Sequence, residues 1–249
     1  RQFNKIKGKK IISVKRRSKY LLINLSQGIT ILAHLGMTGK FFIIDNKNRK
    51  QKTSFYYSLK KNDAKHDHLT IFLNKGYKLI YNDVRKFGFL KLLKNKYISN
   101  SIHLKFLGPE PLKNEFNASY ISKYFLYKKN KIKDLLMDQK FVSGLGNIYC
   151  NEILFLCKLN PFKTIEKIKK KEQLNLVKFT KKILKKSILQ GGSSIKNFAD
   201  TEGKSGSFQQ KFNVYNREKK KCNRRNCSGI IQKIYISNRS SFFCSRCQK

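Results

Sequence analysis

The chain has 249 residues, 40% of them hydrophobic, so it can bury a substantial core without a disulfide framework. Its 56 Lys and Arg residues against 14 Asp and Glu residues give a formal net charge of +42. So large an excess of one sign disfavours a compact fold unless an anionic partner neutralises it, and nucleic acid is the expected partner. Ribosome-associated and membrane-surface binding are the alternatives that charge alone leaves open.

The chain contains no segment typical of a membrane or secreted protein. No apolar run approaches the roughly 20 residues that span a bilayer, and the start RQFNKIKGKKIISVKRR lacks the apolar core of a signal peptide. We therefore expect a soluble, cytoplasmic protein that has no membrane partner and acts as a monomer.

The first third of the chain alternates short β-type segments with turns. The expected strands are IISVKR, YLLINL, ITILAHL, KFFII, LTIFL, YKLIY and FGFLKLL. This pattern predicts an antiparallel sandwich or barrel. The stretch LGPEPL (107–112) carries two of the three prolines and is interpreted as a linker.

From Asn117 the pattern becomes helical. The expected helices are NASYISKYFL, IKDLLMD, one that begins at Asn147, and a long basic helix ended by Gly191 and Gly192. The tail is rich in Cys and Arg. We expect an α+β protein with three domains, at residues 1–112, 113–212 and 213–249.

The segment FVSGLGNIYCNEILF (141–155) contains no Lys or Arg in a chain that is otherwise strongly basic. Gly144, Gly146 and Asn147 lie between its apolar runs. An ordinary helix–helix turn with Asn147 as N-cap is one interpretation. A backbone shaped to bring its N–H groups close to an anion is the other.

Four of the six cysteines form the strongest local motif. They are Cys222-x4-Cys227 and Cys244-x2-Cys247, separated by sixteen residues. Four thiolates on two short knuckles predict one structural, tetrahedral Zn²⁺ that stabilises a hairpin with little core of its own. The four-residue spacer of the first knuckle is longer than usual. Cys150 and Cys157 are interpreted as packing residues.

Arg239 is expected near the tip of the hairpin between the two knuckles. An Arg in that place is either solvated or positioned to bind a phosphate through its planar guanidinium group.

Several segments, in order, resemble formamidopyrimidine-DNA glycosylase, the bacterial-type base-excision family for oxidised purines. They are IISVKRRSKYLL, HLGMTG, KHDHL, YNDVRKFGF, LGPEPL, MDQKFVSGLGNIYCNE, ILQGGSSIKNF, EGKSGSF, VYNRE and RSSFFCSRCQK. The resemblance covers residues 11–249. It implies a β-sandwich domain, a helical domain with a helix-two-turns-helix motif, and a C-terminal zinc hairpin, with FVSGLGN as the turn of that motif.

The resemblance also implies roles for individual residues on damaged duplex DNA. Met37, Arg85 and Phe87 would fill the gap left by an extruded nucleotide. Phosphate contacts are implied for His34, His66, Lys128 or its neighbour Lys129, Asn147 and Tyr215, and for the catalytic residues Lys19 and Arg239. The loop EGKSGSF (202–208) would close over the oxidised base.

In the family, an N-terminal proline attacks C1′ of the damaged nucleotide to give a Schiff base, assisted by a following Glu. Neither residue is present here, so we expect the sequence to be a fragment that binds DNA without forming the covalent intermediate. The alternatives are an endonuclease VIII-type enzyme for oxidised pyrimidines and a non-catalytic, zinc-containing DNA-binding protein. LGPEPL and the long EGKSGSF loop favour the purine enzyme.

Overall fold

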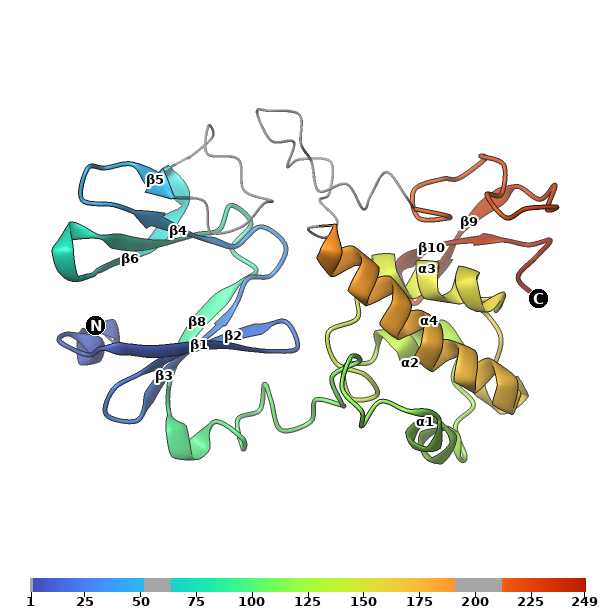
Figure 1. Ribbon diagram of the computed structural model, residues 1–249, viewed down its shortest axis with the longest axis horizontal. Helices are drawn as coiled ribbons and strands as arrows, with labels where there is room; N and C mark the ends of the chain where they lie inside the picture. The colour runs from blue at the N-terminus through green and yellow to red at the C-terminus, as the bar shows by residue number, and fades with distance from the viewer. Residues whose placement is uncertain (1, 52–63, 191–211) are drawn as a thin grey trace. The chain divides into compact units, whose positions relative to one another are not determined.

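The computed structural model describes residues 2–51, 64–190 and 212–249. The described residues divide into two compact units, one ending at Lys105 and one beginning at Phe106 (Figure 1). In these ranges no helix is both long and apolar enough to cross a membrane. The division at 1–112, 113–212 and 213–249 stays a prediction.

The first unit is a two-layered antiparallel β-sandwich, as the sequence predicts. One sheet has the order β1-β2-β3-β8 and the other the order β5-β4-β7-β6 (Figure 1). The strands are β1 (Ile11–Arg17), β2 (Tyr20–Leu25), β3 (Ile29–His34), β4 (Lys40–Ile44), β5 (Lys50–Gln51), β6 (Asp67–Phe72), β7 (Lys78–Asn82) and β8 (Phe89–Lys94). Short 3-10 helices lie at Gln2–Ile6, Ala64–His66, Asn74–Gly76 and Asn95–Tyr97.

The sandwich core consists of side chains from both sheets. Ile23, Ile31 and Ala33 of the first sheet pack in one cluster with Phe41 and Tyr81 of the second. Ile31 and Ala33 are two residues apart on β3, so the pleat directs both side chains to the same face. The loops at the ends of the strands remain exposed, and they carry most of the predicted site residues of this unit.

The described part of the second unit contains four α-helices around one apolar cluster. They are α1 (Ala118–Phe125), α2 (Ile132–Met137), α3 (Asn147–Cys157) and α4 (Lys170–Leu189), with a 3-10 helix at Ile165–Lys167. Asn117 caps α1 by accepting a hydrogen bond from the Tyr120 N–H at 2.9 Å. The helices begin and end close to the predicted positions, whereas Gly191, Gly192 and the loop 202–208 lie outside the described residues.

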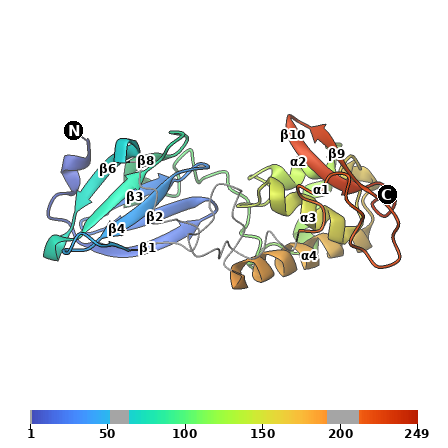
Figure 2. The same ribbon diagram turned by 90° about the horizontal axis from the view of Figure 1, so that it is seen from above.

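The zinc hairpin is formed by β9 (Ile231–Ile236) and β10 (Arg239–Cys244). Helix α3 packs against both α4 and β10, and it lies between α4 and the hairpin in Figure 2. Phe155 of α3 shares an apolar cluster with Val214, Ile231 and Phe242. The hairpin therefore packs on the helix that follows the glycine-containing turn.

Candidate nucleic-acid interface

Two adjacent loops of the first unit present Met37, Arg85 and Phe87 together. The Met37 and Phe87 side chains are 57% and 59% exposed, although both are large and apolar. The Arg85 guanidinium lies 4.6 Å from the Phe87 ring centroid, and its Nη1 lies 3.4 Å from the Met37 sulfur. An exposed apolar pair with a cation across it is costly in water unless a partner covers it.

A buried carboxylate, Asp83, holds these two loops in place. It accepts hydrogen bonds from the Thr38 hydroxyl, from the Gly88 N–H at 2.8 Å and from the Tyr81 hydroxyl at 3.2 Å. The Arg85 N–H in turn donates to the Thr38 hydroxyl oxygen at 3.0 Å. Burial favours a raised pKa for Asp83, but these hydrogen bonds outweigh it and hold the pKa below its usual value. Sequence reasoning missed Asp83.

Lys19 and His34 lie close together at one end of the first sheet. Lys19 is in the turn between β1 and β2, and His34 is the last residue of β3. Burial, then the Lys19 ammonium and then His103 lower the pKa of His34. Its Nδ1 accepts the Gly36 N–H at 3.2 Å, so the neutral ring carries its proton on Nε2 and can donate it to an anion.

His66 lies beside the loop that follows β7 and contains Asp83 and Phe87. Its carbonyl oxygen accepts the Asp83 N–H at 3.1 Å, which fixes the 3-10 turn against the end of β7. The next histidine, His68, donates its Nε2–H to the Asp83 carbonyl oxygen at 2.8 Å. Lys19, His34, Met37, His66, Arg85 and Phe87 thus all come from loops or strand ends of one sandwich.

The turn between α2 and α3 has the conformation that its glycines permit. Gly144 adopts φ +90°, which favours glycine, and its N–H donates to the Gln139 side-chain oxygen at 2.8 Å. Gly146 is the N-cap of α3, and Asn147 is the first helical residue. The first N–H groups of a helix have no acceptor inside the helix, so an anion at this end is favoured.

Asn147 also contacts the start of β10 in the zinc hairpin. Its side-chain amide donates to the Ser240 carbonyl oxygen at 2.9 Å, and the buried Lys133 ammonium of α2 donates to the same oxygen at 3.0 Å. Ser240 follows Arg239 directly, so Asn147 and Lys133 together fix the backbone beside Arg239. Burial, together with the nearby Arg239 and against the opposing effect of Cys150 and Asp134, lowers the pKa of Lys133 to about 8.

Arg239 lies where the sequence predicts, at the hairpin tip. Ser237 and Asn238 both have positive φ, at 46° and 59°, which is the two-residue turn that matches the twist of a hairpin. Arg239 is the first residue of β10, and its side chain is exposed. Asn147 and Arg239 are therefore brought to one region of the second unit.

Tyr215 is fixed from two directions. Its N–H donates to the buried Glu152 carboxylate of α3 at 3.0 Å, and the N–H groups of Asn213 and Val214 donate to the same carboxylate. Its ring packs edge-on against Phe242, with the centroids 5.1 Å apart. Sequence reasoning missed Glu152, because a single carboxylate in an apolar helix carries no positional signal.

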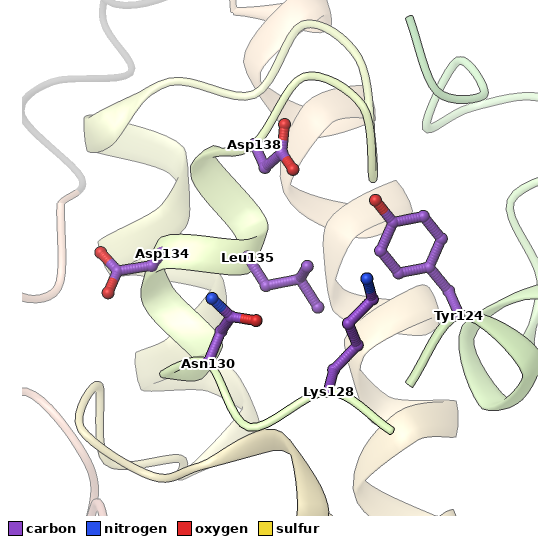
Figure 3. A pocket seen from close by; sticks show the side chains of 6 residues that line it. All are labelled: Tyr124, Lys128, Asn130, Asp134, Leu135 and Asp138. Carbon is purple, nitrogen blue, oxygen red and sulfur yellow. The ribbon is translucent and has the colours of Figure 1, made fainter. Parts of the chain in front are cut away.

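Lys128 lines a small pocket of about 180 Å³ (Figure 3). Its ammonium lies 5.6 Å from the Tyr124 ring centroid. Asp134 and Asp138 of the α2 segment also line the pocket. Two carboxylates disfavour a phosphate inside the pocket, so Lys128 can serve a phosphate only from the rim.

The four predicted zinc ligands converge. All four sulfur atoms lie within 4.8 Å of one another, with Cys222 to Cys247 at 3.9 Å and Cys227 to Cys244 at 3.7 Å. A tetrahedral site with Zn–S bonds of about 2.3 Å requires sulfur separations of about 3.8 Å. These thiolates therefore fit a structural zinc ion, and the longer first spacer does not prevent it. Cys150 and Cys157 are buried elsewhere, in the helical cluster.

Gly229 is a further residue that the zinc site requires. A Cβ atom at this position would lie 2.5 Å from the Cys244 sulfur and 2.8 Å from the Arg246 Cβ. Its carbonyl oxygen accepts the Cys222 N–H at 2.8 Å. The sequence shows a glycine two residues after the ligand Cys227. Only the geometry shows that a larger residue would not fit there.

Comparison with known families matches nearly the whole chain. A model described as the formamidopyrimidine-DNA glycosylase N-terminal domain matches residues 1–90, and one described as the H2TH domain of the same family matches residues 107–199. A zinc finger found in FPG and IleRS matches residues 219–249.

Individual relatives agree with these matches. A formamidopyrimidine-DNA glycosylase from Agrobacterium fabrum is 39% identical over 98% of this chain and 85% of its own length. One from Ruegeria is 36% identical over the whole chain and 86% of its own length. The Lactococcus lactis enzyme in complex with DNA that contains FAPY-dG is 33% identical with a TM-score of 0.83, and covers 99% of this chain and 84% of its own.

Proposed function

The chain belongs to the formamidopyrimidine-DNA glycosylase family, and from that premise we propose how its residues act on DNA. It is a base-excision repair DNA glycosylase with AP lyase activity for oxidised purines, and it holds one structural zinc ion. The observation that carries the proposal is the exposed trio of Met37, Arg85 and Phe87 on loops fixed by a buried carboxylate.

Met37 and Phe87 enter the duplex when the damaged nucleotide leaves it. Extrusion costs a few kcal/mol of lost stacking, and apolar side chains that fill the gap recover part of that energy. Arg85 provides a cation and planar donors for the orphaned base on the opposite strand. Their exposure, together with the support from Asp83, argues for a preformed wedge, because core residues would not be presented this way.

The DNA backbone is held by contacts that position the strand without reading its sequence. In the first unit, the phosphates are contacted by one cation and two imidazoles, those of Lys19, His34 and His66. In the second unit, they are contacted by Tyr215, Lys128 and the N-terminus of α3 at Asn147. Asn147 has an additional role, since its side chain also fixes Ser240 beside Arg239.

Base excision and strand cleavage follow from Schiff-base chemistry at the extruded nucleotide. An amine forms a bond to C1′ and the damaged base leaves, and the resulting protonated imine acidifies the C2′ proton. Loss of that proton expels the phosphate on the 3′ side, and a second elimination expels the other. Lys19 and Arg239 stabilise the charge that develops on the departing phosphates.

The test uses protein expressed from the complete open reading frame and measures base release from duplexes that each carry one lesion. We expect release of 8-oxoguanine to exceed release of an oxidised pyrimidine. Preferential release of the pyrimidine would identify an endonuclease VIII-type enzyme instead. Binding of the lesion duplex with no release of either base would identify a non-catalytic DNA-binding protein.

We also propose that the protein acts as a monomer on the bacterial nucleoid. Its curated relatives are bacterial, and solved relatives are bound to damaged DNA. Mass measurement in solution with and without a short lesion duplex tests the stoichiometry, for which we expect one chain per lesion.

A further inference from the structure

Four rings cluster at the end of the first sheet, where the loops that carry Met37 and Phe87 meet the strands. Tyr20, His34 and Phe89 lie side by side in register across β2, β3 and β8, with ring centroids 5.0 Å apart for Tyr20–His34 and 5.8 Å for His34–Phe89. His103, which follows β8 by nine residues, packs on Phe89 at 4.7 Å and lies 6.0 Å from Tyr20. Two imidazoles thus share one small aromatic surface.

The charged groups around the two imidazoles are cations. The Lys91 ammonium lies 3.0 Å from His103 Nε2, so that nitrogen is the acceptor and the ring is neutral with its proton on Nδ1. Burial, and then the Lys91 ammonium, lower the pKa of His103. The pKa of His34 is lowered in the same way, by burial first and then by Lys19 and His103. None of the charged groups that shift these two pKa values is a carboxylate.

This arrangement is favourable for an anion. Two ammonium groups near two imidazoles repel one another, and a bound anion removes that repulsion and stabilises the protonated rings. The position suits a DNA phosphate, because His34 directly precedes the Met37 loop and Phe89 directly follows the Phe87 loop. A strand whose nucleotide is displaced by the wedge must pass close to the ends of these loops.

We infer that Lys91 and His103 form a further contact for a DNA backbone phosphate, next to Lys19 and His34, and that DNA binding there takes up a proton. This inference rests on the proposed function, since the phosphate belongs to the duplex that the wedge opens. The groups facing His103 are Lys91 from β8, Tyr20 from β2 and His34 from β3, and Lys19 faces His34 from the β1–β2 turn.

The experiment measures the association constant for a duplex with a non-cleavable abasic analogue from pH 8.0 to 5.5 at fixed salt. It uses protein from the complete open reading frame, the variants His103→Gln and Lys91→Met, and Lys94→Met as a control. Lys94 is an exposed lysine at the opposite end of β8, paired with Ile29, so it matches the charge change of Lys91→Met away from the cluster.

We expect the wild-type protein to bind more tightly as the pH falls, because uptake of one proton strengthens binding by at most tenfold per pH unit. His103→Gln should lose about fivefold at pH 5.5 and little at pH 8.0. Lys91→Met should weaken binding and move the acid-dependent rise to higher pH, since the cation that lowers the His103 pKa is gone. Lys94→Met should keep the wild-type pH profile.

Two results would overturn the inference. One is a wild-type pH profile for His103→Gln, which would assign the acid dependence to the other histidines. The other is an equal loss of affinity at every pH together with a lower melting temperature, which would make His103 a packing residue. Failure of the proposed function has a different signature, namely no preference of the wild-type protein for the lesion duplex over intact duplex at any pH.

Discussion

At the scale of single residues, Asp83 connects the two loops that carry the proposed wedge residues. It is fully buried and accepts hydrogen bonds from Thr38 on one wedge loop and Gly88 on the other. A buried carboxylate with several donors stabilises the ionised form, so the folded state has the lower pKa. This stabilisation is present above the unfolded pKa and is lost as the pH falls through the folded pKa.

Replacing Asp83 with Asn should therefore loosen both wedge loops at neutral pH. The amide keeps the size but presents one acceptor oxygen in place of two, and loss of a buried hydrogen bond costs about 1–3 kcal/mol. Hydrogen exchange at the Gly88 amide should accelerate about tenfold or more at pH 7. The difference from wild type should shrink at pH values well below 3.9, where both side chains are neutral. Unchanged exchange at Gly88 at pH 7 would contradict this role.

The wedge itself is tested with Met37→Ala and Phe87→Ala. Each should lower the preference for lesion duplex over intact duplex by about tenfold while sparing non-specific affinity, because a wedge acts only after extrusion. Phe72→Ala is the matched control, since Phe72 is 76% exposed on β6 of the same unit. Equal losses on both duplexes, with a lower melting temperature, would show that Met37 and Phe87 stabilise the fold instead.

At the scale of elements, the zinc hairpin depends on its metal. A hairpin of only two strands is marginally stable on its own, and structural zinc contributes about 10–16 kcal/mol to the folding of comparable peptides. Cys244→Ser should therefore lose the zinc that the wild-type protein holds at one ion per chain, as measured by metal analysis. Full zinc stoichiometry in the variant would reject the four-cysteine site.

Gly229→Ala should also release zinc, although no ligand is altered. The added methyl group would meet the Cys244 sulfur at 2.5 Å and displace it from the tetrahedral arrangement. Ser228→Ala is the control, because Ser228 is the exposed neighbour on the same knuckle. Equal zinc content in both variants would show that the knuckle accommodates the methyl group.

Most elements were predictable from the sequence, because each depends on local signals. Short β-type segments separated by turns predicted the strands, Asn117 predicted the start of a helix, and the cysteine spacing predicted the zinc ligands. The partners of single polar residues were not predictable. Asn147 and Lys133 share the Ser240 oxygen across 93 and 107 residues of sequence, and Asp83 joins two loops that are 45 residues apart. Such pairs depend on how the elements pack, which no local pattern records.

At the scale of the whole molecule, the charge of +42 determines how the protein meets DNA. A strongly cationic surface accelerates encounter and provides affinity that does not depend on sequence. In our proposal, His34, Asn147 and Tyr215 then position the DNA backbone through hydrogen bonds. We expect charge to supply most of the affinity, and Met37, Arg85 and Phe87 to supply the preference for damaged DNA.

Binding to duplex DNA should accordingly weaken steeply with salt. Lys19, Lys128 and Arg239 are the three cationic phosphate contacts that we propose, and each such contact should contribute about −0.9 to the slope of log affinity against log salt concentration. We expect a slope of about −2.7 or steeper in fluorescence anisotropy titrations. A slope shallower than about −2 would contradict these contacts.

The central claim is that this protein excises oxidised purines through a covalent Schiff base. Borohydride trapping on a duplex with one 8-oxoguanine, using protein expressed from the complete open reading frame, tests it most directly. We predict a borohydride-dependent protein–DNA adduct that forms on the lesion duplex and is absent on the intact duplex. Tight binding of the lesion duplex without any trapped adduct would contradict the claim.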